Sequence, residues 1–234
     1  MAWVIHEHAD VDTLAASVAT ELQAVCGEAL ALREQALLAL GGGRTPLPLY
    51  RRLARCPLPW SQVTLLPTDE RCVPHDHPAC NLREIGAAFA AADGVQQQGL
   101  TPPDGDPETS ERHARAALAH YPQPFDAVVL GMGMDGHTAS LFPGVPQLPA
   151  ALDPGSEIAA FRIDPQPLPP EAPYPRVTVS AARLLRARSL HLFITGADKR
   201  AVLERALESH DPLRYPIGAF LHAADARLHV HWSR

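Results

Sequence analysis

Short apolar runs alternate with amphipathic segments along most of this chain, and this alternation is the feature that most limits its fold. The runs QALLAL, VTLLP, DAVVL and HLFIT each have the length of a buried strand. The segments between such runs carry apolar residues at helical spacing. Strands that alternate with helices form βαβ units, whose parallel sheet is covered by helices on both faces. The sequence therefore predicts an α/β protein with a mainly parallel sheet.

The expected elements follow from this pattern in chain order. Chain length favours one large α/β domain over two small ones, so we expect a single domain over residues 1–234. Proline-rich segments at 101–107 and 143–175 are expected to be connections within that domain. Strands are expected at 3–8, 35–40, 61–67, 125–131, 156–161, 176–180, 189–195 and 227–232, and helices at 12–34, 46–55, 81–91, 108–120 and 197–209.

Charge and cysteine content indicate the class of partner and the compartment. The formal net charge of −6 argues against a nucleic-acid or anionic-membrane partner, although an anionic small molecule can still bind in a locally basic cleft. The four cysteines are too sparse for a disulfide scaffold, which favours a reducing compartment. The N-terminus lacks a signal-peptide pattern, and no apolar run reaches the roughly 18 residues of a membrane span. We therefore expect a cytoplasmic protein, as a monomer or small homo-oligomer.

Four loops hold the unusual residues of this sequence. They follow the apolar strands, at residues 41–46, 68–78, 131–140 and 196–199. In parallel sheets, ligands bind beyond the carboxyl ends of the strands. The ligand site is therefore expected where these loops meet.

The third loop matches a dinucleotide-binding pattern, but its surroundings do not fit. The loop has the G-x-G-x-x-G spacing at Gly131, Gly133 and Gly136. In a dinucleotide-binding site, the last glycine begins a helix, and an acidic residue follows at the end of the next strand. Here prolines stand at 143, 146, 149 and 154, and each proline inside a helix costs about 3 kcal/mol. We expect no nucleotide cofactor; the glycines instead let the backbone approach a small ligand.

The first loop, GGGRTP, is typical of an anion site at a helix N-terminus. Pro46 suits the first helical turn, where backbone N–H groups and the helix dipole attract an anion. The glycine-rich loop would expose such N–H groups, and Arg44 and Thr45 add side-chain donors. A tight turn with a surface arginine remains an equal alternative on the loop alone.

The second loop, TDERCVPHDHPAC, is rich in charged residues and possible metal ligands. Arg71 could stabilise a developing oxyanion, and Asp69 or Glu70 could position Arg71 or bind substrate hydroxyls. The alternative is that these three charged residues form only a solvated cluster on the surface. The spacing Cys-x-x-His-x-His-x-x-Cys over residues 72–80 resembles a zinc site. Four ligands within nine residues, interrupted by prolines 74 and 78, would struggle to surround one ion. We therefore expect no metal there.

The third and fourth loops supply a base and cations. His137 could activate water with Asp135 to orient it, since imidazole titrates near neutral pH. Ser140 has no base partner other than that histidine, so direct attack by water is favoured over a covalent serine intermediate. Lys199 lies in the first turn of a helix, where the helix dipole disfavours a positive charge, so a bound anion would explain its position. Arg176 is a weaker candidate for binding the same anion. Together these groups predict a phosphorylated small molecule.

The stretches GGGRTPLPLY, TDERCVPHDHPACN, DAVVLGMGMDGHTASLFPG and TGADKRAVLERAL resemble the 6-phosphogluconolactonase family in order and position over essentially the full chain. The resemblance implies a Rossmann-like three-layer α/β/α sandwich, and hydrolysis of 6-phosphoglucono-1,5-lactone in the oxidative pentose phosphate pathway. His137 would be the base for water and Arg71 the group that stabilises the carbonyl oxygen. The phosphate would be held by Gly42, Gly43, Thr45, Arg176 and Lys199. The chain departs from the family at Gly41 and Arg44, where serine is common, which leaves the phosphate contacts open.

Two alternatives remain at this point. An amino-sugar phosphate isomerase-deaminase shares the fold superfamily, but its loop carries a glutamate where this chain has Phe142, and its DEY motif is DER here. A sugar-phosphate-binding regulator without catalysis would not need His137 and Arg71, both of which are present. The sequence therefore favours hydrolysis.

Overall fold

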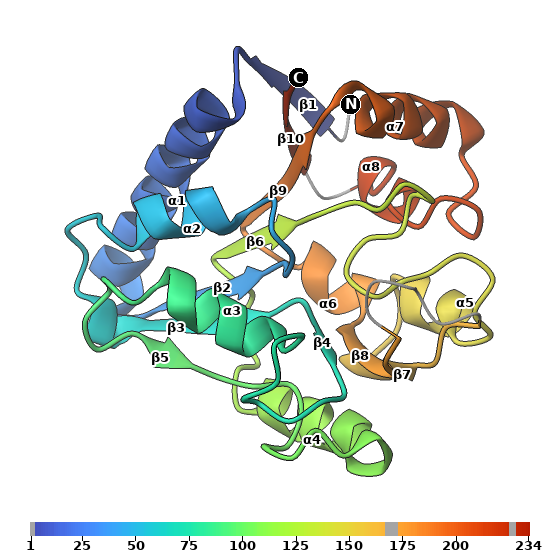
Figure 1. Ribbon diagram of the computed structural model, residues 1–234, viewed down its shortest axis with the longest axis horizontal. Helices are drawn as coiled ribbons and strands as arrows, with labels where there is room; N and C mark the ends of the chain where they lie inside the picture. Colours follow the sequence, from blue (N-terminus) through green and yellow to red (C-terminus); the bar gives the residue numbers. More distant parts are fainter. Residues whose placement is uncertain (1–2, 167–172, 225–227) are drawn as a thin grey trace.

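A seven-stranded sheet forms the centre of the protein (Figure 1). The computed structural model describes residues 3–166, 173–224 and 228–234. The strands run in the order β1-β10-β9-β6-β2-β3-β5, and each neighbouring pair is parallel. The parallel sheet predicted from the apolar runs is therefore confirmed. Its strands are β1 (Trp3–His8), β2 (Ala36–Leu40), β3 (Val63–Pro67), β5 (Gln96–Gln97), β6 (Ala127–Leu130), β9 (Ser189–Thr195) and β10 (Leu228–Ser233).

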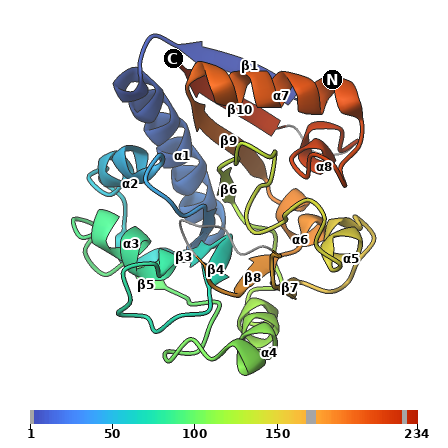
Figure 2. The same ribbon diagram turned by 45° about the vertical axis from the view of Figure 1, so that its right-hand side comes forward.

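Helices cover both faces of this sheet, as the resemblance implied. On one face lie α1 (Val11–Arg33), α2 (Leu47–Leu53) and α3 (Asn81–Ala88), with a short 3₁₀ helix at Trp60–Gln62. The other face is covered by α4 (Pro107–Ala119), α5 (Leu148–Leu152), α6 (Ala181–Leu185), α7 (Ala197–Ser209) and α8 (Gly218–Leu221). Figure 2 shows α1 and α7 on opposite sides of the β1-β10-β9 edge. The fold is an α/β/α sandwich.

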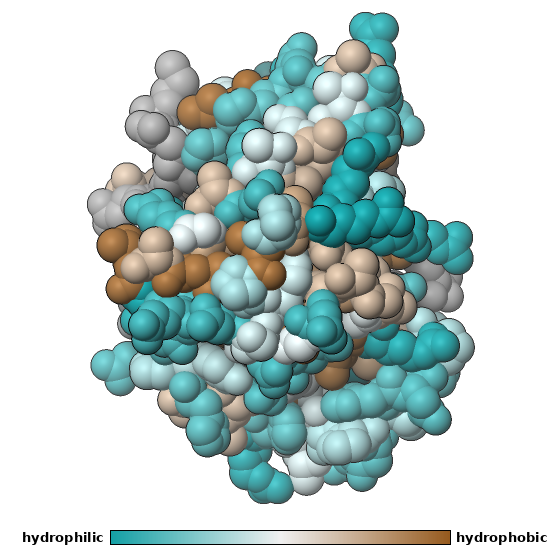
Figure 3. Space-filling view, turned by 90° about the vertical axis from the view of Figure 1, so that its left-hand side faces the viewer, coloured by the Kyte–Doolittle hydropathy of each residue, from teal (hydrophilic) through white to brown (hydrophobic). Residues whose placement is uncertain are grey.

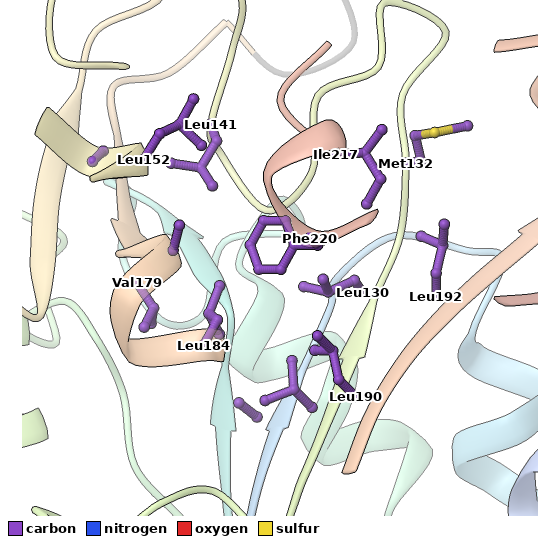
Figure 4. Close-up of a cluster of buried hydrophobic side chains, with 14 of the residues drawn as sticks. Leu130, Met132, Leu141, Leu152, Val179, Leu184, Leu190, Leu192, Ile217 and Phe220 are labelled. Carbon is purple, nitrogen blue, oxygen red and sulfur yellow. The ribbon is translucent and has the colours of Figure 1, made fainter. Parts of the chain in front are cut away.

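Two hydrophobic clusters result from the alternation of side chains along the strands. Leu38 and Leu40 of β2 point into the cluster beneath α1, whereas Leu37 and Ala39 point into the cluster beneath α4 to α8. The second cluster gathers side chains from β6, β9, α5, α6 and α8 around Phe220 (Figure 4). Because every residue of β2 is buried, the strand reads as a continuous apolar run in the sequence.

Helix α1 is the longest element and its ends are set by local chemistry. The carboxylate of Asp10 accepts a hydrogen bond from the N–H of Thr13 at 2.7 Å, which caps the first turn. The helix ends where Glu34 adopts a left-handed conformation with φ of 59°.

The outer surface of the molecule on the α1 and α2 side is largely hydrophilic, with small apolar patches (Figure 3).

A second, antiparallel sheet was not anticipated. It contains β4 (Asp69–Arg71), β8 (Arg176–Val179) and β7 (Ala160–Ile163) in that order. The prediction that DER lies in a loop was wrong, because these residues pair with RVT of β8. The strand expected over 156–161 begins at residue 160 instead. For the strand expected over 227–232, residue 227 lies outside the described residues, and β10 is seen from Leu228 onward.

The segment after the third loop forms no crossover helix. It contains only the five-residue α5, with Pro149 in its first turn, in line with the argument from its prolines. In the part of the chain that the structure describes, no helix combines the length and apolar character needed to cross a membrane.

Candidate active site

A cavity of about 410 Å³ opens where the carboxyl ends of β2, β3, β6 and β9 meet. All four predicted loops contribute to it. Its charged side chains are three cations, from Arg71, Arg176 and Lys199, and one carboxylate, from Asp69. The cavity therefore attracts anions although the whole chain is acidic. Its walls are formed by Gly41, Gly42, Gly43, Thr45, Pro46, Thr68, Asp69, Arg71, Asn81, Gly131, Met132, Gly133, His137, Ala139, Arg176, Phe193 and Lys199.

His137 lies on the wall of this cavity and is held by Asp135. The two are joined by a hydrogen bond of 2.6 Å between Nδ1 of the imidazole and Oδ1 of the carboxylate. The N–H of His137 donates to the same oxygen at 3.1 Å. Burial alone would raise the pKa of Asp135, but the hydrogen bonds from His137 outweigh burial and leave that pKa below its ordinary value. With a carboxylate accepting from Nδ1–H, Nε2 is left with a lone pair that can take a proton.

The backbone around His137 leaves little room for other residues. A Cβ atom on Gly133 would come within 2.2 Å of Nδ1 of His137, so glycine is required there. Ala139 has a φ of 48°, an uncommon conformation for a residue with a side chain. On its other side, the His137 ring packs against Phe142, with ring centroids 4.3 Å apart. These contacts fix the position of the imidazole.

Arg71 ends β4 and is anchored next to the cavity. Its Nη1 donates to the carbonyl oxygen of Ala79 at 2.7 Å. Its Nε atom is buried and has no hydrogen-bond partner within the described residues. A buried guanidinium N–H without a partner is costly, and the same side chain also lines the cavity.

Glu70 does not line the cavity, and its role is to cap α3. Its carboxylate accepts hydrogen bonds from the N–H groups of Arg71, Asn81 and Leu82 at 2.8, 2.7 and 2.8 Å. The side chain is fully buried. Burial raises the pKa of Glu70 to about 7, although these three N–H groups act in the opposite direction. Glu70 thus positions the backbone of Arg71 and the start of α3, and the idea that it binds substrate hydroxyls has no support from its placement.

Asp69 makes a contact that the sequence did not reveal. Its Oδ2 accepts a hydrogen bond of 2.5 Å from the hydroxyl of Ser140 in the third loop. Its backbone oxygen accepts from Nδ2 of Asn81 at 2.7 Å. These bonds tie the second loop to the third loop and to α3. Ser140 is buried and bonded to a carboxylate, but is not among the residues that line the cavity.

Asn81 is a buried polar residue of the cavity that sequence reasoning missed. It is buried at the first position of α3 and reaches the loop after β2, where a Cβ on Gly42 would come within 2.0 Å of its Oδ1. The signal available in the sequence was a polar residue at the start of an expected helix beyond the second loop. In the loop after β2, Gly43 has a φ of 87° and Thr45 faces the cavity. Arg44 is not among the lining residues.

Lys199 and Arg176 reach the cavity from a helix and from the three-stranded sheet, respectively. Lys199 is in the first turn of α7, which follows Gly196 with a φ of 89°. Burial lowers the pKa of Lys199, so a nearby anion would favour its charged form. Arg176 of β8 is buried, and its guanidinium lies 5.1 Å from the centre of the Phe142 ring.

The residues of the rejected zinc pattern are used for other contacts. The thiol of Cys80 donates to Glu70 at 3.5 Å, Nε2 of His75 lies 3.1 Å from the carbonyl oxygen of Thr101, and Nδ1 of His77 accepts from a backbone N–H. Within the described residues, the side chains of this loop form no group that could hold a metal ion.

Comparison with known proteins agrees with this geometry. A family model described as glucosamine-6-phosphate isomerases/6-phosphogluconolactonase matches residues 9–232. A 6-phosphogluconolactonase of Pseudomonas putida is 37% identical over 97% of this chain and 92% of its own length. The crystal structure of a 6-phosphogluconolactonase from Shewanella baltica has a TM-score of 0.91 and 33% identity, covering 99% of this chain and 97% of that one.

A monomeric glucosamine-6-phosphate deaminase also shares the fold, with a TM-score of 0.80 and 20% identity over 98% of this chain and 97% of that chain. At this identity the likeness concerns the fold alone. The family match extends over nearly the whole chain, and relatives above 30% identity cover 97% and 98% of it. The chain belongs to the family of glucosamine-6-phosphate isomerases and 6-phosphogluconolactonases.

Proposed function

We propose that this protein hydrolyses 6-phosphoglucono-1,5-lactone to 6-phosphogluconate. The observation that carries the proposal is the His137–Asp135 pair on the wall of a cavity whose other charged groups are mainly cationic. An imidazole oriented by a carboxylate is a general base for water. The names of the relatives with 37% identity support the same activity.

His137 and Arg71 would perform the chemistry. Nε2 of His137 takes a proton from water, and the resulting hydroxide attacks C1 of the lactone. Arg71 then stabilises the negative charge that develops on the carbonyl oxygen. The bond from C1 to the ring oxygen breaks, and His137 returns the proton to the ring oxygen. A lactone already reacts slowly with water, so a base worth about 10²–10⁴-fold and oxyanion stabilisation of about 3 kcal/mol are sufficient.

The phosphate would be held by the cations and the N–H and hydroxyl donors on the cavity wall. Lys199 and Arg176 supply charge, and Gly42, Gly43 and Thr45 supply N–H and hydroxyl donors. Asp69 lines the cavity and would bind a sugar hydroxyl through Oδ1, since its Oδ2 accepts from Ser140. Since Arg44 is not on that wall, its part in phosphate binding has less support than that of Lys199.

The position of Phe142 argues against the isomerase-deaminase alternative. An aldose–ketose conversion needs additional acid–base groups. The amino-sugar phosphate isomerase-deaminases carry a glutamate at the position of Phe142. In this chain Phe142 is buried and packs against His137, so no carboxylate can occupy that space. Hydrolysis needs only the groups already present.

A coupled assay tests the proposal. The lactone is generated from glucose 6-phosphate by its dehydrogenase, and formation of 6-phosphogluconate is followed with and without this protein. We expect a large acceleration over spontaneous hydrolysis. Binding of 6-phosphogluconate without acceleration would instead favour a regulator, and ammonia release from glucosamine 6-phosphate would favour the deaminase.

A further inference from the structure

Five histidines gather on one face of the sheet, away from the cavity. Side chains alternate along a strand, so residues two apart point to the same face. The pairing of the strands sets His6 opposite His231, and His229 opposite His191. Phe193 is two residues after His191 on β9 and therefore shares its face; it packs in the cluster beneath α1, so α1 covers this face. The set consists of His6 and His8 of β1, His191 of β9, and His229 and His231 of β10.

Two of these imidazoles are in a place where apolar side chains would be expected. His191 is 1% exposed and His231 is fully buried. Nδ1 of His191 lies 3.1 Å from Nε2 of His231, a hydrogen-bond distance at which one neutral ring donates its N–H to the other. Burial, and then neighbouring imidazoles, lower the pKa of both residues, which keeps them neutral. The proposed lactonase chemistry uses neither of them.

A carboxylate from α1 completes a triangle with these two nitrogens. Oε2 of Glu21 lies 3.8 Å from Nδ1 of His191 and 3.6 Å from Nε2 of His231. In a tetrahedral zinc site with bonds of about 2.0–2.1 Å, ligand atoms are separated by about 3.4 Å. The three observed separations lie within about 0.4 Å of that value, so an ion could be bound with small side-chain movements.

We propose that Glu21, His191 and His231 form a binding site for a divalent transition-metal ion, with Zn²⁺ as the best match. Two imidazoles and one carboxylate suit ions of intermediate softness better than Mg²⁺ or Ca²⁺, which prefer oxygen ligands. The side chain of Glu21 is 36% exposed, so an ion has a path from solvent, and water can take the fourth position.

The surroundings of His191 support this assignment. Its second ring nitrogen, Nε2, lies 2.7 Å from the hydroxyl of Ser189. When Nε2–H donates to that hydroxyl, Nδ1 carries the lone pair that faces Glu21 and His231. Such a hydrogen bond on the far side of the ring is the usual way in which proteins orient a metal-binding histidine. His231 would bind through Nε2, and its Nδ1 is buried without a hydrogen-bond partner among the described residues, so the orienting bond is present on His191 only.

The bound ion would join the first helix to the last strands of the sheet. Glu21 belongs to α1, and the two histidines belong to β9 and β10. None of the three lines the cavity described above. Because such a site does not exist in the unfolded chain, ion binding would stabilise the folded protein and leave catalysis unchanged.

Metal titration of the full-length protein tests this inference. The protein is freed of metal with a chelator, and Zn²⁺ is then added in competition with a chromophoric chelator. We expect one ion per chain with submicromolar affinity and a higher melting temperature. Glu21→Gln should weaken binding at least about 100-fold, because it removes a charged ligand. Glu28→Gln, an equal charge change at an exposed position on the same helix, should have no effect.

A second variant separates binding from folding. His191→Leu places an apolar side chain on a buried face and should fold, yet lose the site. The Co²⁺ form of the wild-type protein should show the intense visible absorption of a four-coordinate ion, and His191→Leu should lack it. Equal Zn²⁺ affinity in Glu21→Gln and Glu28→Gln, or no saturable binding by the wild-type protein, would overturn the proposal. The lactonase assay does not enter this test, so either proposal can fail alone.

Discussion

Nδ1 of His137 and Oδ1 of Asp135 are 2.6 Å apart, and when Nδ1–H donates in this bond the lone pair of Nε2 is free to accept a proton. In Asp135→Asn, the amide can present its NH₂ group to Nδ1, which moves the ring proton to Nε2 and blocks base catalysis. We expect kcat to fall by about 10²–10⁴-fold while the fold is kept. Steady-state rates in the coupled assay and circular dichroism check this.

His137→Ala is the reference for that variant. It removes the base itself, so it should lose at least as much activity as Asp135→Asn, and the double variant should lose little more, because the two residues act as a unit. A near-normal kcat in His137→Ala would sink the assignment of the base.

Arg71 should act on the transition state more than on substrate binding. Arg71→Met removes the group that meets the developing oxyanion, and we expect kcat to fall by about 10²–10³-fold with a smaller change in KM. Arg71→Lys keeps the charge but cannot reproduce the fork of the guanidinium, so it should recover only part of the activity. A change confined to KM would place Arg71 among the binding residues instead.

Lys199 should act on binding of the phosphate. Lys199→Met removes a half-buried cation of the cavity and should raise KM by about 10–10²-fold with little change in kcat, since a charge-assisted hydrogen bond contributes about 1.5–3 kcal/mol. The control is Arg200→Met on the same helix, because Arg200 pairs with Glu7 and Glu204 and does not line the cavity. Equal KM values for the two variants would contradict the phosphate assignment.

Glu70 should make stability depend on pH. Its pKa is about 7 in the folded protein, above the ordinary value of 4.5. Because the pKa is raised, the folded state binds the proton of Glu70 more tightly than the unfolded state does. This contribution to the free energy of unfolding is fully present below about pH 4.5 and is lost as the pH rises through about 7; it amounts to about 3 kcal/mol. Glu70→Gln lacks this contribution. Urea unfolding of both proteins is measured between pH 4.5 and 8. As the pH rises, the free energy of unfolding of the wild type should fall relative to that of Glu70→Gln. The same pH dependence in both proteins would refute the prediction.

The buried strands and long helices could be predicted from the sequence because their periodicity is local. QALLAL and HLFIT are fully or largely buried, as continuous apolar runs indicate. Strand β4 could not be predicted in this way, because it consists of three charged residues and is stabilised by pairing with β8, more than 100 residues later. The bond between Asp69 and Ser140 likewise depends on two loops brought together by the sheet. The four-loop site followed from topology, whereas the contacts within it did not.

Gly42 gives a direct test of how these loops fit together. A Cβ at this position would lie 2.0 Å from Oδ1 of Asn81, whose amide also holds the backbone of Asp69. In Gly42→Ala, Asn81 must move and give up that bond, so we expect a loss of about 1–3 kcal/mol in unfolding free energy together with a higher KM.

Gly27→Ala is the matched control for this substitution. Gly27 lies inside α1, and a Cβ there would meet no atom within 4 Å. Alanine favours a helix over glycine by about 1 kcal/mol, so this variant should be stabilised by about that amount with unchanged kinetics. Urea unfolding and the coupled assay measure both variants side by side. If Gly42→Ala proved as stable and as active as Gly27→Ala, Asn81 would not be the residue that fixes the first loop against the second.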